Sequence, residues 1–576
     1  MKTLWNQLSA HYIREANSPS STIHQCLGQP QIQALLAQAD REKQYPISVR
    51  QILHVQGLSR LLANSAEDPL AKKEETPLTM WHAVDLLQSL ASTSGTIVIT
   101  VSVNYLALMP AYIAGTEEQL RWLFGKVHEG NFAAMLLSEA AHGSDLRQNE
   151  TSAKRQGRHY CLTGEKGLIN GGSQHELLMV LAKVDETAFD FFMVERDETV
   201  TKPKRWATLP MPGADISSVR FEQMSLPLHS RLGSAGSGFN ILQKAFTFTR
   251  GGIAGMNAGI SQRAVNLATE YAQTRQLYGK PILHLGAIAD HLLKMKAMHW
   301  LLLAMTHKTT AVLNTYGAAA TYHASIAKVG TSQLAEQIVN EGRLLHGARG
   351  LLVENAFHQL VRDVPLFGTF DGTSHVVLAQ IETRLAQMVQ MTPSQPGVLL
   401  EMMQAAYRQH PVNLVQVARQ RKRPLLIPLP NYLEALTDVV RDNDLSPVTT
   451  LASFLWGLVA HSQKSGLWAT DQGWRFALAD QAVRLEMLVA LVETADSGAY
   501  QLLSGQPIPE LFRQQQPVYN YAFGWFGSQI AADIRQLAYQ CNHALPNDLR
   551  IAEQSLSTIA RQARTAIQQN LEILIS

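Results

Sequence analysis

The sequence predicts an α+β protein built as a helical domain, a β domain and two further helical domains, in that order. Two observations lead to this prediction. Apolar residues follow a helical period up to about residue 130, alternate as in strands up to about residue 235, and then return to the helical period. At roughly 150 residues per domain, the 576-residue chain also has room for about four units. We expect domains over residues 1–130, 131–235, 236–391 and 398–576.

The composition favours large buried surfaces and argues against several classes of function. Hydrophobic residues make up 46% of the chain and charged residues only 17%, which is below the usual quarter. A net charge of +2 gives no general basic field, so we expect no nucleic acid as a partner. The 20 histidines show no ligand spacing such as HExxH, and we expect no metal site.

The cysteines and the N-terminus bear on the cellular compartment. Cys26, Cys161 and Cys541 lie far apart and form no CxxC pair, which favours reduced thiols over a disulfide framework or a zinc site. The first residues, MKTLWNQ, lack the apolar run and the small-residue cleavage site of a secretory signal. We therefore expect a cytoplasmic protein.

One long stretch of the N-terminal domain has no formal charge. It runs between Asp85 and Glu117 and is long enough to cross a membrane. Serines, threonines, Asn104 and Pro110 interrupt it, which favours a helix buried in the core of the protein. We expect no transmembrane segment.

A helix start follows this stretch. Thr116 is a favourable N-cap, and Glu117 and Glu118 come next, where acidic side chains complement the positive end of the helix dipole. The segment EEQLRWLFGKVHEG is therefore predicted to be helical and to end at Gly130.

The predicted β domain consists of short apolar runs separated by turn residues. Glycine-rich residues 233–238 mark its exit. The predicted strands cover residues 132–139, 159–164, 176–184, 189–195 and 218–226.

Long helical periods return from Phe239 to Met391. Thr392–Gly397 has the composition of a linker, and the remaining residues are again helical by period, without an internal repeat. The long helical segments cover residues 240–275, 287–313 and 322–345.

Five segments carry motifs whose shared order and spacing are informative. They are Leu136–Asp145, Leu162–Asn170, Val219–Gly233, Arg250–Pro281 and Gly347–Ser374. In this order they resemble the TEPxxGSD, NGxKxWIT, VxFxxVxVP…LG, TR…YxxxRxxFGKPI and GGxG…RD…EGTS motifs of the acyl-CoA dehydrogenase family. The resemblance covers about residues 85–390 well. The C-terminal tail is similar in size and place to the extension of very-long-chain members.

The resemblance implies both an architecture and a reaction. The architecture is a helical domain, a β-barrel-like middle domain, a helical bundle with the catalytic base, and an extra C-terminal helical domain. The reaction is dehydrogenation of an acyl thioester to a 2,3-enoyl thioester, with FAD as cofactor. A base removes the α-proton, and the hydride from the β-carbon goes to the flavin.

Asp371 occupies the position of the catalytic glutamate in straight-chain members of the family. Burial would raise the pKa of this carboxyl and strengthen it as a base. Aspartate is also the residue that nitroalkane oxidases, which are family relatives, carry here. Thr249 stands at the alternative base position of branched-chain members and cannot act as a base. The other interpretation is that Asp371 caps the following helix, since Asp-Gly-Thr-Ser is ordinary N-cap chemistry.

The resemblance also implies contacts to substrate and cofactor. Arg250 would line the pocket of the base, although a lone arginine on an apolar helix could equally pair with a buried acid. Substrate-binding residues by resemblance are Ser144, Arg250 and Gly372. Cofactor-binding residues by resemblance are Ser138, Gly143, Ser144, Asn170, Arg275, Tyr278, Gly347 and Thr373.

Some of these cofactor contacts differ from the family pattern. Arg275 and Tyr278 would reach the FAD of a neighbouring subunit, which makes a dimer necessary for a complete site. Leu168 replaces an aromatic residue beside the flavin, and Gly286 and Leu344 replace glutamines that touch FAD.

The Arg362–Asp363 pair is expected to be structural, shaping the turn before the loop of the base.

The expected partners follow from the same resemblance. The substrate is an acyl thioester of CoA or of an acyl carrier protein, an electron-transfer flavoprotein accepts the electrons, and the chain is a homodimer. Two alternatives are a flavoprotein oxidase of the nitroalkane type and a family member that has lost FAD and serves as a binding protein.

Overall fold

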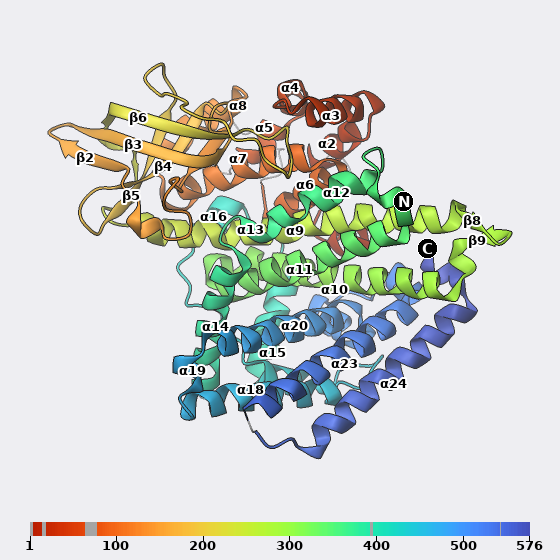
Figure 1. The fold of residues 1–576 in the computed structure, drawn as a ribbon. Coiled ribbons are helices and arrows are strands. Elements are labelled where there is room, and N and C mark those ends of the chain that lie inside the picture. Colours follow the sequence, from red (N-terminus) through yellow and green to blue (C-terminus); the bar gives the residue numbers. More distant parts are fainter. Residues whose placement is uncertain (1–3, 14–18, 64–77, 392–394, 542, 576) are drawn as a thin grey trace.

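The N-terminal part of the chain is helical. The computed structural model describes residues 4–13, 19–63, 78–391, 395–541 and 543–575. Trp5, Trp81 and Tyr112 are fully buried here and belong to the main hydrophobic core. The helices are α1 (Leu4–Ser9), α2 (Pro19–Leu27), α3 (Pro30–Glu42), α4 (Ile47–Val55), α5 (Leu58–Leu62), α6 (Met80–Thr93), α7 (Gly95–Ala114) and α8 (Glu117–His128) (Figure 1).

Two sequence predictions are confirmed in this region. α8 begins with a capping box, in which the Thr116 hydroxyl accepts from the Gln119 amide and the Gln119 side chain accepts from the Thr116 N–H. α7 is the charge-free helix, and among the described residues it is long and apolar enough to cross a membrane. However, 89% of its most apolar window is buried inside the fold, as expected of a core helix.

The middle of the chain forms a seven-stranded sheet in the order β6-β3-β2-β4-β5-β7, with β1 paired to β4 in parallel. Its inner face has a core of its own, which includes Leu162, Phe192 and Phe221. The strands are β1 (Ala133–Leu136), β2 (Ser152–Gln156), β3 (His159–Asn170), β4 (Leu177–Lys183), β5 (Phe189–Glu195), β6 (Ile216–Pro227) and β7 (Arg231–Leu232).

The sequence pattern missed two of these strands for a physical reason. β2 exposes three of its five residues and therefore shows no apolar run, and β7 is only two residues long. The five strands that were predicted are all present.

Three long helices lie side by side beneath the sheet and the N-terminal helices in the view of Figure 1. They are α9 (Gly238–Thr274), α10 (Gly286–Tyr316) and α11 (Thr321–Leu345). The short hairpin of β8 (Gln276–Leu277) and β9 (Lys280–Pro281) projects from the far end of α9. α12 (Ala356–Asp363), α13 (Pro365–Thr369) and α14 (Ser374–Gln390) complete this bundle.

The C-terminal extension is a second helical layer that packs on α10, α11 and α14. Part of the expected linker, residues 392–394, lies outside the described residues. The helices are α15 (Pro396–Arg408), α16 (Leu414–Arg419), α17 (Leu429–Thr437), α18 (Ser446–Lys464), α19 (Leu467–Thr470), α20 (Gln472–Ala495), α21 (Ser497–Ser504), α22 (Glu510–Gln514), α23 (Gln516–Gln540) and α24 (Asn547–Gln569).

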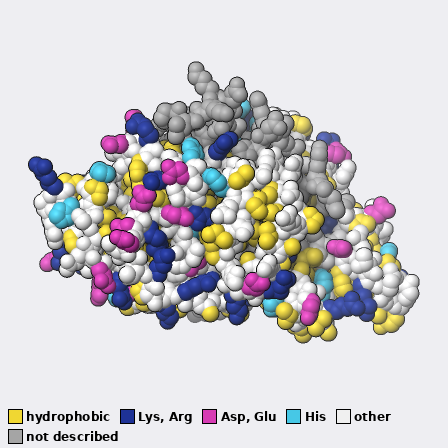
Figure 2. All heavy atoms as spheres, turned by 90° about the horizontal axis from the view of Figure 1, so that it is seen from above, with side chains coloured by type: hydrophobic (Ala, Val, Ile, Leu, Met, Phe, Trp, Pro, Cys, Tyr) yellow, Lys and Arg dark blue, Asp and Glu magenta, His cyan; other side chains and the backbone are white. Residues whose placement is uncertain are grey.

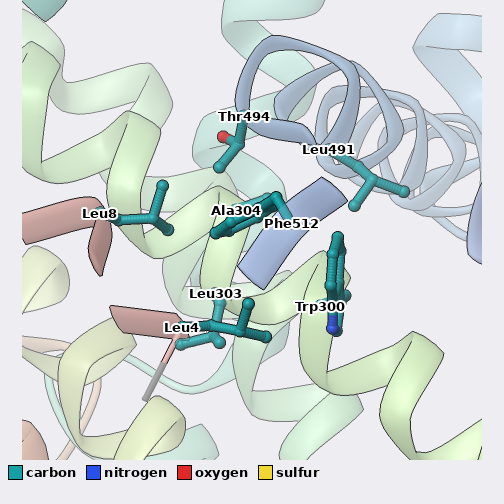
Figure 3. Close-up of a pocket in the computed structure, with 8 residues that line it drawn as sticks. All are labelled: Leu4, Leu8, Trp300, Leu303, Ala304, Leu491, Thr494 and Phe512. Carbon is teal, nitrogen blue, oxygen red and sulfur yellow. The ribbon is translucent and has the colours of Figure 1, made fainter. Parts of the chain in front are cut away.

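Chain segments that are distant in sequence meet at a small apolar gap. It lies among α1, α10, α20 and α22 and is lined by Leu8, Trp300, Leu491 and Phe512 among others (Figure 3). The gap leaves no room for a water-sized molecule. It is therefore a packing junction between the N-terminal helix and the C-terminal extension, and not a ligand site.

Glycines on α9 set its close approach to α6. A Cβ atom at Gly255 would lie 2.9 Å from the carbonyl oxygen of Val84, and one at Gly259 would lie 2.1 Å from that of Gln88. We predict that Gly259→Val lowers the free energy of unfolding by about 1–3 kcal/mol, because the helices must move apart. Urea denaturation measures this loss. Gly457→Ala is the control, since its Cβ would meet no atom within 4 Å.

Charged side chains of both signs are interspersed over the face shown in Figure 2, in keeping with the net charge of +2. All three cysteines are free, as expected.

Candidate active site

The conformation of the Asp371 loop tests the capping interpretation of that residue. The loop connects α13 to α14, and Thr373, not Asp371, is the N-cap residue of α14. No side chain caps this helix start. The capping interpretation of Asp371 is therefore wrong. Asp371 has a φ of +55° and is followed by Gly372 at +93°, so the loop turns through left-handed conformations.

The carboxyl group of Asp371 lies in a buried position between a hydroxyl and two cations. Its Oδ2 atom is buried and has no hydrogen-bond partner. Burial raises the pKa of Asp371, while the nearby Thr249 hydroxyl and the charges of Arg250 and Lys328 act in the opposite direction. A carboxyl group in these surroundings can ionise and still be a stronger base than an exposed aspartate.

Arg250 supports the Asp371 loop from α9. Its Nη2 donates to the carbonyl oxygen of Asp371 at 3.3 Å, and its Nη1 donates to Ser325 and Gln380. The side chain is buried, and burial lowers the pKa of Arg250 to about 10, against the attraction of Asp371. Arg250 therefore lies next to a buried acid, as one interpretation expected, and its role in lining a substrate pocket stays a prediction.

Lys328 is a member of this site that the sequence reasoning missed. It is fully buried on α11, and its Nζ donates to the carbonyl oxygens of Gly368 at 2.7 Å and Gly372 at 2.5 Å. Burial and the nearby Arg250 lower the pKa of Lys328 to about 8, whereas Asp371 and Glu336 raise it. A lysine inside the apolar helix segment SIAKVG was the available signal.

A second group of expected residues lies on the middle domain. The Ser138 hydroxyl donates to the carbonyl oxygen of Gly167 at 2.8 Å, and Asn170 Nδ2 donates to that of Ile99 at 3.1 Å. Asn170 Oδ1 is buried and has no partner. Gly143 and Ser144 are exposed. Leu168 is 56% exposed, with a φ of +57°.

A third group lies at the opposite end of the central helices. Arg275 follows α9, and Tyr278 is 84% exposed in the turn of the β8–β9 hairpin (Figure 1). Gly347 begins the turn after α11, with a φ of +58°. At 1.5 Å per residue, α9 separates Arg250 from Arg275 by roughly 37 Å. One subunit therefore does not bring Arg275, Tyr278 and Gly347 together with Asp371, Gly372 and Thr373.

The Arg362–Asp363 pair is structural, as expected. Arg362 binds both Asp40 on α3 and Asp363. Asp363 also accepts from the backbone N–H of Met211 at 2.7 Å, which ties α12 to the loop before β6. Among the described residues, no three His, Cys, Asp or Glu side chains are placed to hold a metal ion.

Comparison with family models identifies the two central domains. Residues 134–224 match the model of the acyl-CoA dehydrogenase middle domain, and residues 236–386 match that of the acyl-CoA dehydrogenase C-terminal domain. The two central domains of this chain belong to the acyl-CoA dehydrogenase family. The chain is an oxidoreductase of this FAD-dependent class, which acts on CH–CH bonds.

Curated relatives share the central part of this acyl-CoA dehydrogenase. A probable medium-chain specific acyl-CoA dehydrogenase of Caenorhabditis briggsae is 29% identical over 282 residues, which is 47% of this chain and 67% of the relative. A 3-(aryl)acrylate reductase of Clostridium sporogenes is 29% identical over 317 residues, which is 52% of this chain and 82% of the relative.

Solved structures show how far the fold extends. Butyryl-CoA dehydrogenase of Megasphaera elsdenii matches with a TM-score of 0.58 and 22% identity, covering 63% of this chain and 95% of its own. An acyl-CoA dehydrogenase of Bacillus anthracis, solved with FAD, matches with a TM-score of 0.75 and 19% identity over 98% of both chains. The second match confirms the expected four-part architecture, including the C-terminal extension.

The residues of this chain fit a flavin cofactor. Asn170 offers a buried oxygen with no partner, and Leu168 presents an apolar side chain to solvent from a left-handed position. Open space faces the backbone of Gly143, Gly286 and Gly347, where a Cβ atom would meet nothing within 4 Å. Leu168 would offer a bound flavin an apolar contact in place of the ring stacking that the family's aromatic residue supplies.

Proposed function

We propose that this acyl-CoA dehydrogenase removes the α-proton of an acyl thioester with Asp371 and yields a 2,3-enoyl thioester. The observation that carries the proposal is the buried Asp371 carboxyl, with one oxygen free of any partner. That oxygen can accept a proton without first breaking a hydrogen bond inside the protein. FAD, when bound, accepts the hydride that leaves the β-carbon.

The residues around Asp371 are proposed to ionise the base, to hold its backbone and to bind substrate and FAD. The Thr249 hydroxyl and the positive charges of Arg250 and Lys328 near the carboxyl favour its ionised form. Arg250 also holds the backbone of the base through the Asp371 carbonyl. Ser144 and Gly372 are assigned to the substrate, and Ser138, Gly143, Asn170 and Thr373 to FAD in the same subunit.

The separation of the two groups on α9 supports a homodimer. Arg275, Tyr278 and Gly347 lie too far from Asp371 to serve the same active site, so we assign them to the FAD of a partner subunit. An arginine at this position suits the pyrophosphate. Two such subunits would each complete the other's site.

The thioester carrier and the electron acceptor are further parts of the proposal. A prolyl acyl carrier protein oxidase is among the solved structures of the same fold, at 23% identity and a TM-score of 0.58. We therefore propose a CoA or acyl carrier protein thioester as substrate. We propose an electron-transfer flavoprotein as acceptor and a location in the cytoplasm.

The first experiment is the visible absorption spectrum of the purified protein with its released flavin quantified. We expect about one FAD per chain, and anaerobic bleaching by an acyl thioester. A protein that stays colourless after added FAD would contradict the proposal and support a binding protein without flavin.

Oxygen consumption separates the dehydrogenase from an oxidase. We expect the thioester-reduced protein to transfer electrons to an electron-transfer flavoprotein much faster than to dioxygen. Rapid dioxygen consumption with a nitroalkane, together with no bleaching by acyl thioesters, would instead support the nitroalkane oxidase alternative.

A further inference from the structure

Two buried cations hold the backbone of the Asp371 loop from opposite helices. Lys328 on α11 donates to Gly368, the residue before the end of α13, and to Gly372, directly after the aspartate. Arg250 on α9 donates to the carbonyl oxygen of Asp371, which lies between Gly368 and Gly372 in the chain. The ammonium group of Lys328 therefore binds one carbonyl before Asp371 and one after it.

The hydrogen bonds of Lys328 distinguish it from an ordinary buried ion pair. Both of its hydrogen bonds go to backbone carbonyls, while Asp371 and Glu336 act on it through their charge. A buried lysine costs free energy unless its donors and its charge are compensated. Both hydrogen bonds of the buried Lys328 ammonium group are made to the loop that carries Asp371.

The turn of the loop uses an uncommon backbone conformation. Asp371 has a φ of +55°, in the left-handed region, which aspartate and asparagine adopt more readily than most other residues with a side chain. The hydrogen bonds of Arg250 and Lys328 to the carbonyls of the loop hold that conformation in place. A shift of the loop would also move the free Oδ2 atom of Asp371, and small displacements of a base are costly for proton transfer.

We propose that Lys328 is a positioning residue for proton abstraction, which holds the Asp371 carboxyl in place by clamping Gly368 and Gly372. This inference rests on the proposed function of Asp371 as the base. Lys328 itself needs no contact with substrate or FAD, and it acts through the geometry and the charge of the loop.

The test compares Lys328→Met with the wild-type holoenzyme by stopped-flow reduction of the bound flavin. We expect the limiting rate of reduction to fall about 10–100-fold, because the base is displaced. The concentration of thioester at half-maximal rate should change little, since the substrate contacts remain. Lys328→Arg keeps both charge and donors, and we expect it to recover most of the rate.

The pH profile supplies a readout that a merely structural role would not move. The charged or titratable groups around the loop are Arg250 from α9, Lys328 and Glu336 from α11, and Asp371 itself. Removing the Lys328 charge should raise the pKa of Asp371 further. The pH at which flavin reduction becomes half-maximal should then shift upward in Lys328→Met and return in Lys328→Arg.

The matched control is Lys296→Met on α10. Burial also lowers the pKa of Lys296 to about 8, so this variant removes a comparably desolvated charge away from the loop. We expect no change in its pH profile or rate per bound FAD. If Lys328→Met yields no soluble flavoprotein, Lys328→Gln is measured in the same way.

The outcomes separate this inference from the proposed function. A Lys328 variant whose rate per bound FAD and pH profile equal those of the wild type overturns the clamp, even if its thermal stability is reduced. If Asp371→Asn also reduces its flavin at the wild-type rate, the proposed base is wrong as well. If flavin reduction is slow in Asp371→Asn but unimpaired in Lys328→Met, the positioning role of Lys328 is wrong and the role of Asp371 as the base stands.

Discussion

Asp371→Asn is expected to retain FAD and to lose about 10²–10⁴-fold in the rate of flavin reduction by an acyl thioester, because the amide cannot accept the α-proton. The substitution tests chemistry with little structural disturbance. Asparagine tolerates the left-handed backbone that Asp371 adopts, and it is nearly isosteric with aspartate. Anaerobic stopped-flow measurement of the visible absorption of the oxidised flavin would follow the reaction.

Asp371→Glu is the matched control, since it keeps the carboxylate but advances it by about one ångström. We expect an activity between those of the wild type and Asp371→Asn. Unimpaired reduction in Asp371→Asn, at normal FAD content, would remove Asp371 from its assigned role.

The same carboxyl should govern the pH dependence of the reaction. A general base works in its ionised form, so the rate of flavin reduction should rise with pH through the pKa of Asp371. Burial raises that pKa above its ordinary value, and the rising limb should therefore lie at higher pH than an exposed aspartate would give. Asp371→Asn should lack this limb.

Lys308→Met is expected to lower the free energy of unfolding by about 3–5 kcal/mol, the largest effect on stability that we predict. Lys308 on α10 is buried, and its Nζ donates to Glu486 at 3.2 Å and to Glu493 at 3.1 Å, both on α20. Burial alone would lower the pKa of Lys308, but the two carboxylates outweigh it and the pKa is raised. Without the lysine, two acids would be left buried side by side.

This cluster joins the dehydrogenase body to its C-terminal extension. Tyr407 on α15 donates to the second oxygen of Glu493 at 2.8 Å and so adds a third helix to it. Urea and thermal denaturation measure the loss of stability, and limited proteolysis shows whether the extension loosens. The triple variant Lys308→Met, Glu486→Gln, Glu493→Gln should recover much of the loss, because no unpaired charge remains. A Lys308→Met variant as stable as the wild type would show that the cluster contributes little.

Local sequence signals located the elements with strong periodicity or capping. Thr116 and Gln119 lie within four consecutive residues and form their capping box without help from the rest of the chain. The short continuous apolar runs of β4 and β5 and the long helical periods of α9–α11 are equally local. The short β7 and the exposed β2 lacked such a pattern. β2 forms a hairpin with the adjacent β3, and β7 forms by pairing with β5, about 40 residues earlier.

The motif order along the chain also identified the family and singled out Asp371, because the family's chemistry needs a carboxyl group at that point. The role of that carboxyl, as cap or as base, was not decided by its neighbours in sequence. The tertiary structure excluded the cap by beginning α14 after Thr373, and it placed the carboxyl of Asp371, with Oδ2 buried, near side chains from α9 and α11, while its role as the base stays a proposal. The fold also brings Lys328 to the Asp371 loop, although it lies 43 positions before Asp371 in the chain. Periodicity and caps are properties of adjacent residues, whereas desolvation and charge depend on what the fold brings together from afar.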